Sequence, residues 1–391
     1  MLNLVRAFLQ CGREVDLVVC RLQGAYVQSV PEAAKLVVLE SAGQLPGRLA
    51  ALMANLRWPS TVLRAVVLPS KTAPEVEYLD SLKQYFRERR PDIVLSAMTY
   101  ANLVALWARN AVDAAIPVAV SERIALSQHC DRESSWRKWR WRYLPPLVKR
   151  NYPHADAIIA VSRQVADDLS TITGLPEGTI RTIYNPVVDD SLRSQAAEPL
   201  VHPWFVPLSA PVVLGVGRLV EQKDFSTLIR AFARVRARRE VRLMLLGEGK
   251  QRGLLQELVE SLGLAEDVEM PGFVTNPFQY MARASALVLS SEYEGLPGVI
   301  IQALACGCPV VSTDCPGGSA EILDGGKYGP LVKVGDEVAL SEAIESVLDH
   351  PIDKRVLVAR AEEFSVDRAA ERYLSVLDGL VARRLDDIRD T

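Results

Sequence analysis

An arginine and a lysine share one short glycine-containing turn, residues 215–228 (GVGRLVEQKDFSTL). The turn follows a β-branched run and leads into a segment with apolar residues at helical spacing, so Arg218 and Lys223 are expected at the carboxyl end of a strand. Arginine offers a fork of donors and lysine a point charge, a pairing suited to a diphosphate. The alternative is two ordinary surface cations, and these residues alone leave both interpretations open.

A second segment, residues 290–323 (SSEYEGLPGVIIQALACGCPVVSTDCPGGSAEIL), predicts a strand end, a glycine-rich turn, a helix, a strand and another glycine-rich turn. Gly295 and Gly298 bracket a Leu-Pro pair just before the helix. A helix N-terminus presents unpaired amides and the positive end of its dipole, which favour phosphate, and glycine permits close approach. Glu294 stands at the mouth of this turn. Alone, such a turn is weak evidence, because every doubly wound fold has several.

Hydrophobic periodicity predicts the elements that must position these residues. Short β-branched runs alternate with amphipathic segments, which is typical of doubly wound parallel sheets with crossover helices, an α/β class. Strands are expected near 15–20, 35–39, 92–96, 117–121, 155–161, 180–184, 212–216, 242–246, 268–271, 286–290, 309–313 and 331–334. Helices are expected near 76–89, 102–110, 163–173, 225–239, 252–262, 298–305, 340–349 and 366–386. Two such sheets leave a cleft at the carboxyl ends of their strands, where these folds bind ligands.

The length of 391 residues suggests two or three domains. A polar, proline-containing stretch at 189–211 interrupts the alternation and is expected to be the linker. We expect an N-terminal Rossmann-like domain over 1–200 and a C-terminal one over 201–364. A final helix over 365–391 is expected to pack back toward the N-terminal domain.

Composition excludes several classes of protein. Lys+Arg total 45 and Asp+Glu 48, and the formal net charge of −3 argues against bulk attraction to nucleic acid. No apolar run of about 18 residues predicts a membrane-spanning helix, and no signal-peptide pattern is seen. Six cysteines are too sparse for a disulfide scaffold, and the C-x-C spacing of Cys306 and Cys308 does not match a structural zinc site. We therefore expect a cytoplasmic protein without a metal.

The first residues have an unusual order of elements. Leu2, Val5, Phe8 and Leu9 are helix-spaced, and Gly12 stands where a C-cap glycine would. A doubly wound sheet normally opens with a strand, so we expect the first strand and its turn to be missing because the start is assigned too late. The alternative is a fold whose first element is a helix.

Four blocks of the second half resemble a known family in their order and spacing: GVGRLVEQKDFSTLI, LMLLGEGKQRGLLQEL, VEMPGFVTN and the 290–323 segment. They are similar to the group 1 domain of the retaining nucleotide-sugar glycosyltransferases of family 4. REVDLVVC, PDIVLS, ADAIIAVS and IRTIYNPV give a weaker match in the first half. The resemblance implies a GT-B fold, in which two Rossmann-like domains face a cleft, with the donor bound mainly to the second and the acceptor to the first.

The resemblance also implies the reaction. A sugar would move from a nucleoside-diphosphate sugar to a hydroxyl of a glycan or lipid-linked acceptor, with retention of configuration, in cell-surface polysaccharide or glycolipid synthesis. A UDP-sugar is the first expected donor and a GDP-sugar the second, with no cofactor and no metal. The alternatives are a catalytically silent sugar-nucleotide-binding protein and a GT-B sugar-nucleotide epimerase.

Residue roles carry over from the family at matching positions. Gly217, Arg218 and Lys223 form the G-R-x4-K turn that holds the donor diphosphate. Glu294 is the first glutamate of the family's Glu-x7-Glu motif and is expected to face the donor sugar, with a positioning and electrostatic role in catalysis. Glu248, in LLGEG, is a secondary candidate near the same site.

Further donor contacts are implied around the two glycine-rich turns. The backbone at Pro297, Gly298 and Val299 would approach the sugar or phosphates, and the loop with Phe273 and Val274 would receive the nucleobase. This chain departs from the family at the second glutamate of the motif, where it has Gln302. An amide still binds ribose hydroxyls but lacks the charge, so weaker ribose binding is expected. A Gly-rich loop of the family falls in the part expected to be missing, so the chain as given could be inactive.

The first half gives less definite candidates. Glu122, beside Arg123 after an expected strand, could act on the acceptor hydroxyl, or it could form a structural ion pair. Three residues that follow the strand expected at 92–96 are candidates for lining the cleft: Thr99, Tyr100 and Asn102. His129 is the histidine best placed for base chemistry, with a surface loop as the alternative.

Tryptophan and basic residues alternate over 136–150 (WRKWRWRYLPPLVKR). The members of this segment that fit contact with anionic lipid are Trp136, Arg137, Trp139, Arg140 and Trp141. A packed helix with half-buried tryptophans explains the same pattern, and these two interpretations stay open. Stacking on nucleic acid bases has no other support in the chain, and no nucleic acid partner is expected.

Overall fold

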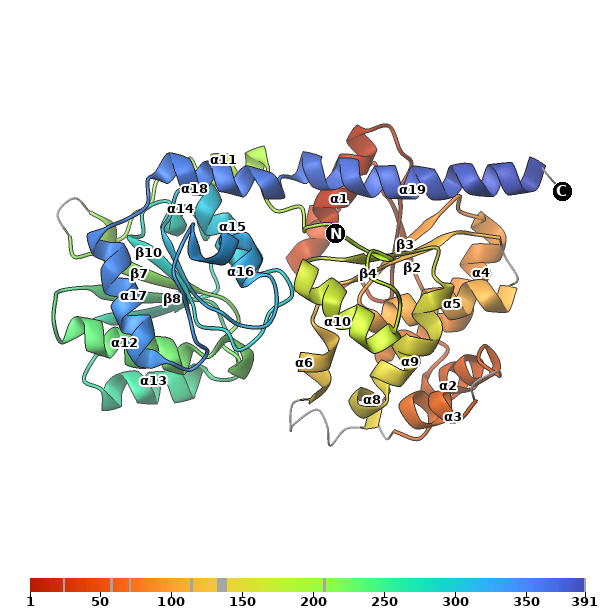
Figure 1. Ribbon diagram of the computed structural model, residues 1–391, viewed down its shortest axis with the longest axis horizontal. Helices are drawn as coiled ribbons and strands as arrows, with labels where there is room; N and C mark the ends of the chain where they lie inside the picture. Colours follow the sequence, from red (N-terminus) through yellow and green to blue (C-terminus); the bar gives the residue numbers. More distant parts are fainter. Residues whose placement is uncertain are drawn as a thin grey trace. The chain divides into compact units, whose positions relative to one another are not determined.

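The structure, a computed structural model (Figure 1), describes residues 1–23, 25–56, 59–69, 72–112, 115–131, 139–206 and 209–389. The chain divides into two compact units. Unit 1 comprises Met1–Pro186 with Asp367–Thr391, and unit 2 comprises Val187–Val366. The chain therefore leaves unit 1 once and returns to it for its last helix.

Unit 2 is built on a parallel sheet. In the part that the structure describes, its strands are β7 (Val212–Val216), β8 (Arg242–Leu246), β9 (Val268–Gly272), β10 (Ala286–Leu289), β11 (Val310–Thr313) and β12 (Leu331–Val332), in the order β12-β11-β10-β7-β8-β9. All six expected strands are confirmed to within a few residues. The chain winds from β7 toward β9 on one side and from β10 toward β12 on the other, so β7 and β10 are neighbours at the point where the direction reverses.

Helices connect and cover the strands of unit 2. They are α11 (Asp190–Ala197), α12 (Phe225–Arg236), α13 (Arg252–Ser261), α14 (Phe278–Met281), α15 (Gly298–Ala305), α16 (Ser319–Ile322), α17 (Glu337–Asp349) and α18 (Lys354–Ala361). The expected apolar face of α12 is buried: Leu228 and Phe232 pack with Val213 and Leu243 of the sheet. This core fixes the carboxyl ends of the strands relative to one another, and the candidate site residues follow those strand ends.

The stretch at 189–211 is not a simple linker, which corrects the sequence-based expectation. Asp189 caps α11 by accepting a hydrogen bond from the Leu192 amide at 2.8 Å. The helix is tied into unit 2, because the Asn276 side chain donates to the carbonyl of Gln195 at 2.9 Å. The polar composition of this segment reflects a capped surface helix.

Unit 1 divides its described strands between two parallel sheets. β1 (Asp16–Val19) pairs with β2 (Lys35–Val38), and β3 (Val94–Ala97), β4 (Val118–Glu122), β5 (Ala157–Ala160) and β6 (Ile180–Thr182) pair in sequence order. The expected strands are present. Their grouping into two sheets could not be read from periodicity, which places strands without pairing them.

The helices of unit 1 surround these sheets. They are α1 (Leu2–Gln10), α2 (Gln44–Met53), α3 (Pro59–Val62), α4 (Leu79–Arg89), α5 (Thr99–Val112), α6 (Leu126–Asp131), α8 (Trp139–Arg142), α9 (Leu144–Asn151), α10 (Arg163–Thr173) and most of α19 (Val366–Arg389). α19 is fixed to the unit by an ion pair of Arg13 with Asp378 at 2.8 Å, and by Tyr373, whose hydroxyl lies 3.3 Å from the Ser121 hydroxyl. Among the described residues, no helix has the length and apolarity needed to cross a bilayer.

Candidate active site at the switch point of unit 2

The turn after β7 carries the two expected cations. Leu219 is fully buried and anchors the turn, and Lys223 ends the short 3-10 helix Glu221–Lys223. The turn after β8 lies directly against it: the Leu219 amide donates to the Glu248 carbonyl at 2.9 Å, and a Cβ on Gly247 would lie 1.9 Å from the Gly217 carbonyl oxygen. Glycine at 247 therefore allows two turns at one edge of the sheet to touch.

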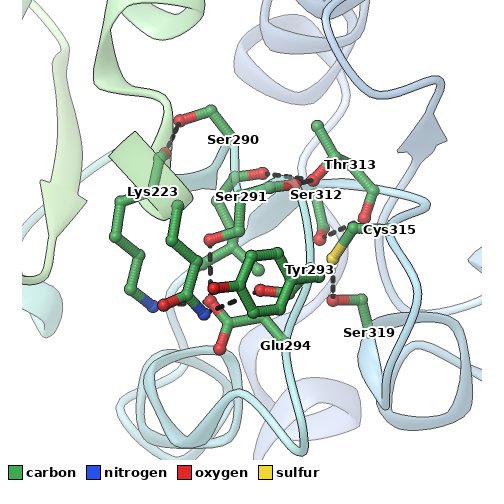
Figure 2. A network of polar contacts seen from close by, with 11 residues as sticks. Lys223, Ser290, Ser291, Tyr293, Glu294, Ser312, Thr313, Cys315 and Ser319 are labelled. Atoms are coloured by element: carbon green, nitrogen blue, oxygen red, sulfur yellow. Dashed lines mark hydrogen bonds and ion pairs between the residues drawn. The ribbon is translucent and has the colours of Figure 1, made fainter. Parts of the chain in front are cut away.

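Lys223 and Glu294 meet at the switch point. The Lys223 Nζ lies 2.6 Å from Glu294 Oε1, and the Ser291 hydroxyl donates to the same oxygen at 2.7 Å (Figure 2). Both side chains of the ion pair are largely enclosed, with 16% and 11% exposed. Because they come from the turns after β7 and β10, the pair stands where open α/β sheets bind ligands.

Hydrogen bonds join the ends of three neighbouring strands around this pair (Figure 2). The Ser290 hydroxyl donates to the Lys223 carbonyl at 2.8 Å, and the Thr313 hydroxyl donates to the Ser291 carbonyl at 2.7 Å. β7, β10 and β11 are thereby linked beyond their ladder bonds. The network holds the Lys223–Glu294 pair in place from both sides.

The two glycine-rich turns of the 290–323 segment pack on each other. The Glu294 amide donates to the Pro316 carbonyl at 2.8 Å. Gly317 has φ +129°, and a Cβ there would lie 2.3 Å from the Glu294 carbonyl oxygen. A side chain at this position would push the turn that carries Glu294.

Two residues of the network were missed by the sequence analysis. Ser291 bonds the Glu294 carboxylate directly, and Gln222 donates from its side chain to the Tyr293 carbonyl at 2.8 Å. The Ser-Ser pair at the end of an expected strand was a usable signal for Ser291. Gln222 gave none, because its partner is distant in sequence.

Other donor-side candidates lie at the same edge of the sheet. Arg218 is exposed, and its guanidinium has no hydrogen-bond or ion-pair partner among the residues that the structure describes. α15 begins at Gly298, as expected, with Pro297 at its N-cap and Gln302 half-buried in its interior. The first amides of this helix, at Gly298 and Val299, have no intrahelical acceptor.

The remaining two donor-side predictions concern the turns after β8 and β9. Phe273 is 68% exposed directly after β9, and Val274 beside it is half-buried. The Glu248 carboxylate is half exposed and pairs with Arg252 at 2.8 Å. Glu248 therefore contributes its backbone to the site through Leu219, while its side chain is engaged on α13.

The acceptor-side candidates of unit 1 are buried, which corrects the expectation that they line a cleft. Glu122 has no exposed surface, and its carboxylate accepts hydrogen bonds from the Thr99 hydroxyl at 2.9 Å, the Tyr152 hydroxyl at 2.8 Å and the Arg123 amide at 3.0 Å. Asn102 donates to the Tyr152 hydroxyl at 3.0 Å. Within the described part of the chain, Glu122 is therefore held by hydrogen bonds, and not by the structural ion pair that the sequence analysis gave as the alternative.

Tyr100 is also buried, at the start of α5, and its ring packs edge-on against Trp141 at 6.2 Å. Of the basic tryptophan segment (residues 136–150), residues 136–138 lie outside the described residues, as do the side chains of Trp139 and Arg140. The backbone of His129 lies on α6, but its side chain lies outside the described part. Trp141 thus supports the packed interpretation for one tryptophan of the segment.

Burial raises the pKa of Glu122 above its ordinary 4.5, more than the hydrogen bonds from Tyr152, Arg123 and Thr99 lower it. An acid with a raised folded-state pKa binds its proton more tightly when folded, so wild-type stability should fall as pH rises from about 4.5 through the raised value. The Glu122→Gln variant should not show this loss. Urea unfolding across pH would measure it, with the exposed Glu14→Gln as control. A wild-type minus Glu122→Gln difference that is flat with pH would contradict the prediction.

The cysteines of the second half are packed into unit 2. Cys308 and Cys315 are buried, and the Cys315 Sγ lies 3.6 Å from the Ser319 hydroxyl (Figure 2). Burial raises the pKa of the Cys315 thiol. Within the described ranges, no group of three or more His, Cys, Asp and Glu side chains is arranged to hold a metal ion.

Comparison with known proteins identifies the family. The model of the family described as "Glycosyl transferases group 1" matches residues 210–350, and that of the "Glycosyl transferase 4-like domain" matches residues 1–186. Together they take in most of both units. The chain belongs to the group 1 glycosyltransferases.

Individual relatives agree with this assignment. The N-acetylgalactosamine-N,N'-diacetylbacillosaminyl-diphospho-undecaprenol 4-alpha-N-acetylgalactosaminyltransferase of Campylobacter jejuni is 32% identical over 60% of this chain and 63% of its own length. The lipopolysaccharide outer core galactosyltransferase WaaB has a similar fold, with a TM-score of 0.70 at 18% identity over 96% of this chain and 94% of that one. The HepE protein of Anabaena, solved with UDP and glucose, has a TM-score of 0.64 to this structure. Its sequence is 20% identical, and the match covers 87% of this chain and 97% of that one. The GT-B fold expected from the sequence is confirmed.

Proposed function

We propose that the chain transfers a sugar from a nucleoside-diphosphate sugar to a hydroxyl of a glycan or lipid-linked acceptor, with retention of configuration. The observation that carries the proposal is the enclosed Lys223–Glu294 pair, 2.6 Å apart, at the switch point of unit 2. A diphosphate leaving group develops negative charge next to a cation, and a carboxylate positions sugar hydroxyls. The relative named for transfer to a diphospho-undecaprenol sugar supports a lipid-linked acceptor and a role in cell-surface glycan synthesis.

The proposed reaction uses residues of unit 2 on the donor. The bond between the anomeric carbon and the diphosphate oxygen breaks, its electron pair stays on the diphosphate, and the acceptor oxygen bonds to the anomeric carbon. Arg218, Lys223 and the free amides at the start of α15 stabilise the departing charge. Glu294 orients the sugar, and the proton of the acceptor hydroxyl leaves with the diphosphate. No step requires a metal ion or a cofactor.

Recognition of the nucleoside is assigned to three side chains. The exposed Phe273 ring and Val274 offer apolar surface to the base, and Gln302 offers its amide to the ribose. UDP is the first choice of nucleotide, supported by the UDP in the HepE structure, and GDP is the second.

We propose that the reaction takes place in the cytoplasm, at the inner face of the membrane, and that the basic tryptophan segment contacts the membrane.

Intact mass of products from a panel of UDP- and GDP-sugars, each offered with a lipid diphosphate-linked sugar, tests the proposal. A glycosylated acceptor is expected with one UDP-sugar, and NMR of the product should show the donor's anomeric configuration. Gln302 favours one rival function, a catalytically silent sugar-nucleotide-binding protein, because the amide lacks the negative charge of the glutamate that contacts ribose in the family. Donor binding without product would support that rival. A donor isomerised without acceptor would show an epimerase and contradict transfer.

A further inference from the structure

Helix α2 of unit 1 turns its large apolar side chains outward. Leu45, Leu49 and Met53 are spaced four residues apart along the helix, and Leu56 continues the same face in the turn that follows. Their exposed fractions run from 52% for Leu49 to 68% for Leu45. We call these four residues the α2 face. A surface helix normally buries its large apolar residues, so this orientation requires a cause.

The cause lies on the opposite side of the helix. Gly47 and Ala51 face inward, and Ala51 is fully buried. A Cβ on Gly47 would lie 2.6 Å from the Val76 carbonyl oxygen, so the helix backbone approaches the 3-10 segment Pro74–Tyr78 too closely for any larger residue. Small residues therefore fix the inner side, and the leucines and the methionine are held outward by the packing.

The sequence around the α2 face is basic. The chain has no Asp or Glu between Glu40 and Glu75, while Arg48, Arg57, Arg64 and Lys71 fall within that stretch. It also has none between Glu133 and Asp156, a stretch that includes the basic tryptophan segment. In a protein whose formal net charge is −3, these two stretches therefore carry basic residues without acidic ones.

The tertiary structure brings the two cationic stretches together. α2 contacts the helical turn Leu63–Val67, which in turn contacts α8, at one end of unit 1 (Figure 1). The guanidinium carbons of Arg64 and Arg142 each lie 5.8 Å from the centre of the Tyr143 ring, so the two cations share one aromatic side chain. Leu63 and Leu68 add exposed apolar surface at the same turn.

We propose that the α2 face, together with Arg64 and Arg142, docks unit 1 on an anionic lipid bilayer. Exposed aliphatic side chains along one side of a helix enter the acyl boundary, and neighbouring arginines attract lipid phosphates. A second copy of the chain fits less well, because a two-fold interface here would bring like charges together. The inference extends the membrane contact proposed above to a surface that the sequence analysis did not single out, and it makes no use of the transfer reaction.

Co-sedimentation with vesicles tests this surface in the absence of donor and acceptor, so its result is independent of whether the chain transfers sugar. The full chain should bind vesicles of mixed phosphatidylglycerol and phosphatidylcholine and bind pure phosphatidylcholine weakly. The Leu49→Gln/Met53→Gln variant should lower the partition coefficient roughly tenfold or more, since each side chain loses its transfer into an apolar phase. Glutamine is a good helix former, and the replaced side chains are exposed, so α2 should remain folded.

Matched variants test whether vesicle binding depends on the α2 face and on the two arginines. Leu254→Gln removes a leucine of similar exposure, 64%, from α13 of unit 2 and should leave vesicle binding unchanged. Arg64→Gln/Arg142→Gln should reduce the preference for phosphatidylglycerol several-fold. Three results would overturn the proposal: absence of binding to either vesicle, binding that survives both α2-face substitutions, or a wild-type dimer that Leu49→Gln/Met53→Gln converts to a monomer.

Discussion

Replacing Lys223 with alanine is expected to reduce donor-dependent turnover about 100-fold or more, the range seen when one preorganised donor to developing negative charge is removed. Lys223 Nζ lies 2.6 Å from Glu294 Oε1 in a largely enclosed pair. The variant would lose the cation that we propose to contact the diphosphate, and it would leave the Glu294 carboxylate without its counter-charge. We therefore also expect unit 2 to lose about 3 kcal/mol of unfolding free energy. Steady-state kinetics and urea unfolding measure the two effects.

Two further variants separate binding from stability at this site. Lys223→Ala/Glu294→Gln removes both charges, and it should regain most of the stability without regaining turnover. Arg218→Ala should weaken nucleoside diphosphate binding by about tenfold, as for one charged hydrogen bond, with unchanged stability because Arg218 is exposed. Unchanged diphosphate affinity in both Arg218→Ala and Lys223→Ala, measured by calorimetry, would show that the assigned site is wrong.

The Gly317→Ala variant is expected to damage the same site without touching a charged residue. Its Cβ would lie 2.3 Å from the Glu294 carbonyl oxygen, at a φ of +129°. The turn carrying Glu294 must move, which should separate its carboxylate from Lys223. We expect a loss of about 2 kcal/mol or more in unfolding free energy and a clear fall in nucleoside diphosphate affinity.

Gly335→Ala is the matched control for this effect. Gly335 also has a positive φ, +77°, but a Cβ there meets nothing within 4 Å. The control should lose about 1 kcal/mol from backbone strain and keep its nucleotide affinity. Equal loss of affinity in the two alanine variants would mean that general destabilisation, rather than the contact with Glu294, accounts for the result.

The sequence by itself determined the alternating elements and the donor-side candidates of unit 2. β7 and β8 have the predicted bounds, and α15 begins at Gly298 as expected, because local periodicity and a Pro-Gly helix start are properties of short segments. The G-R-x4-K turn and the E-G-L-P-G turn were also visible as short motifs. Both follow strands, which placed Lys223 and Glu294 at one edge of the sheet before any pairing was known.

Only the tertiary structure decided which of these residues touch and which are buried. The Lys223–Glu294 ion pair depends on β7 and β10 being neighbours, a pairing between strands far apart in sequence. Glu122 follows the same local pattern as Glu294, yet Thr99 and Tyr152 enclose it from other elements. The outward face of α2 depends on the close approach of Gly47 to Val76. Periodicity is a local property, whereas burial and charge pairing depend on contacts between distant segments.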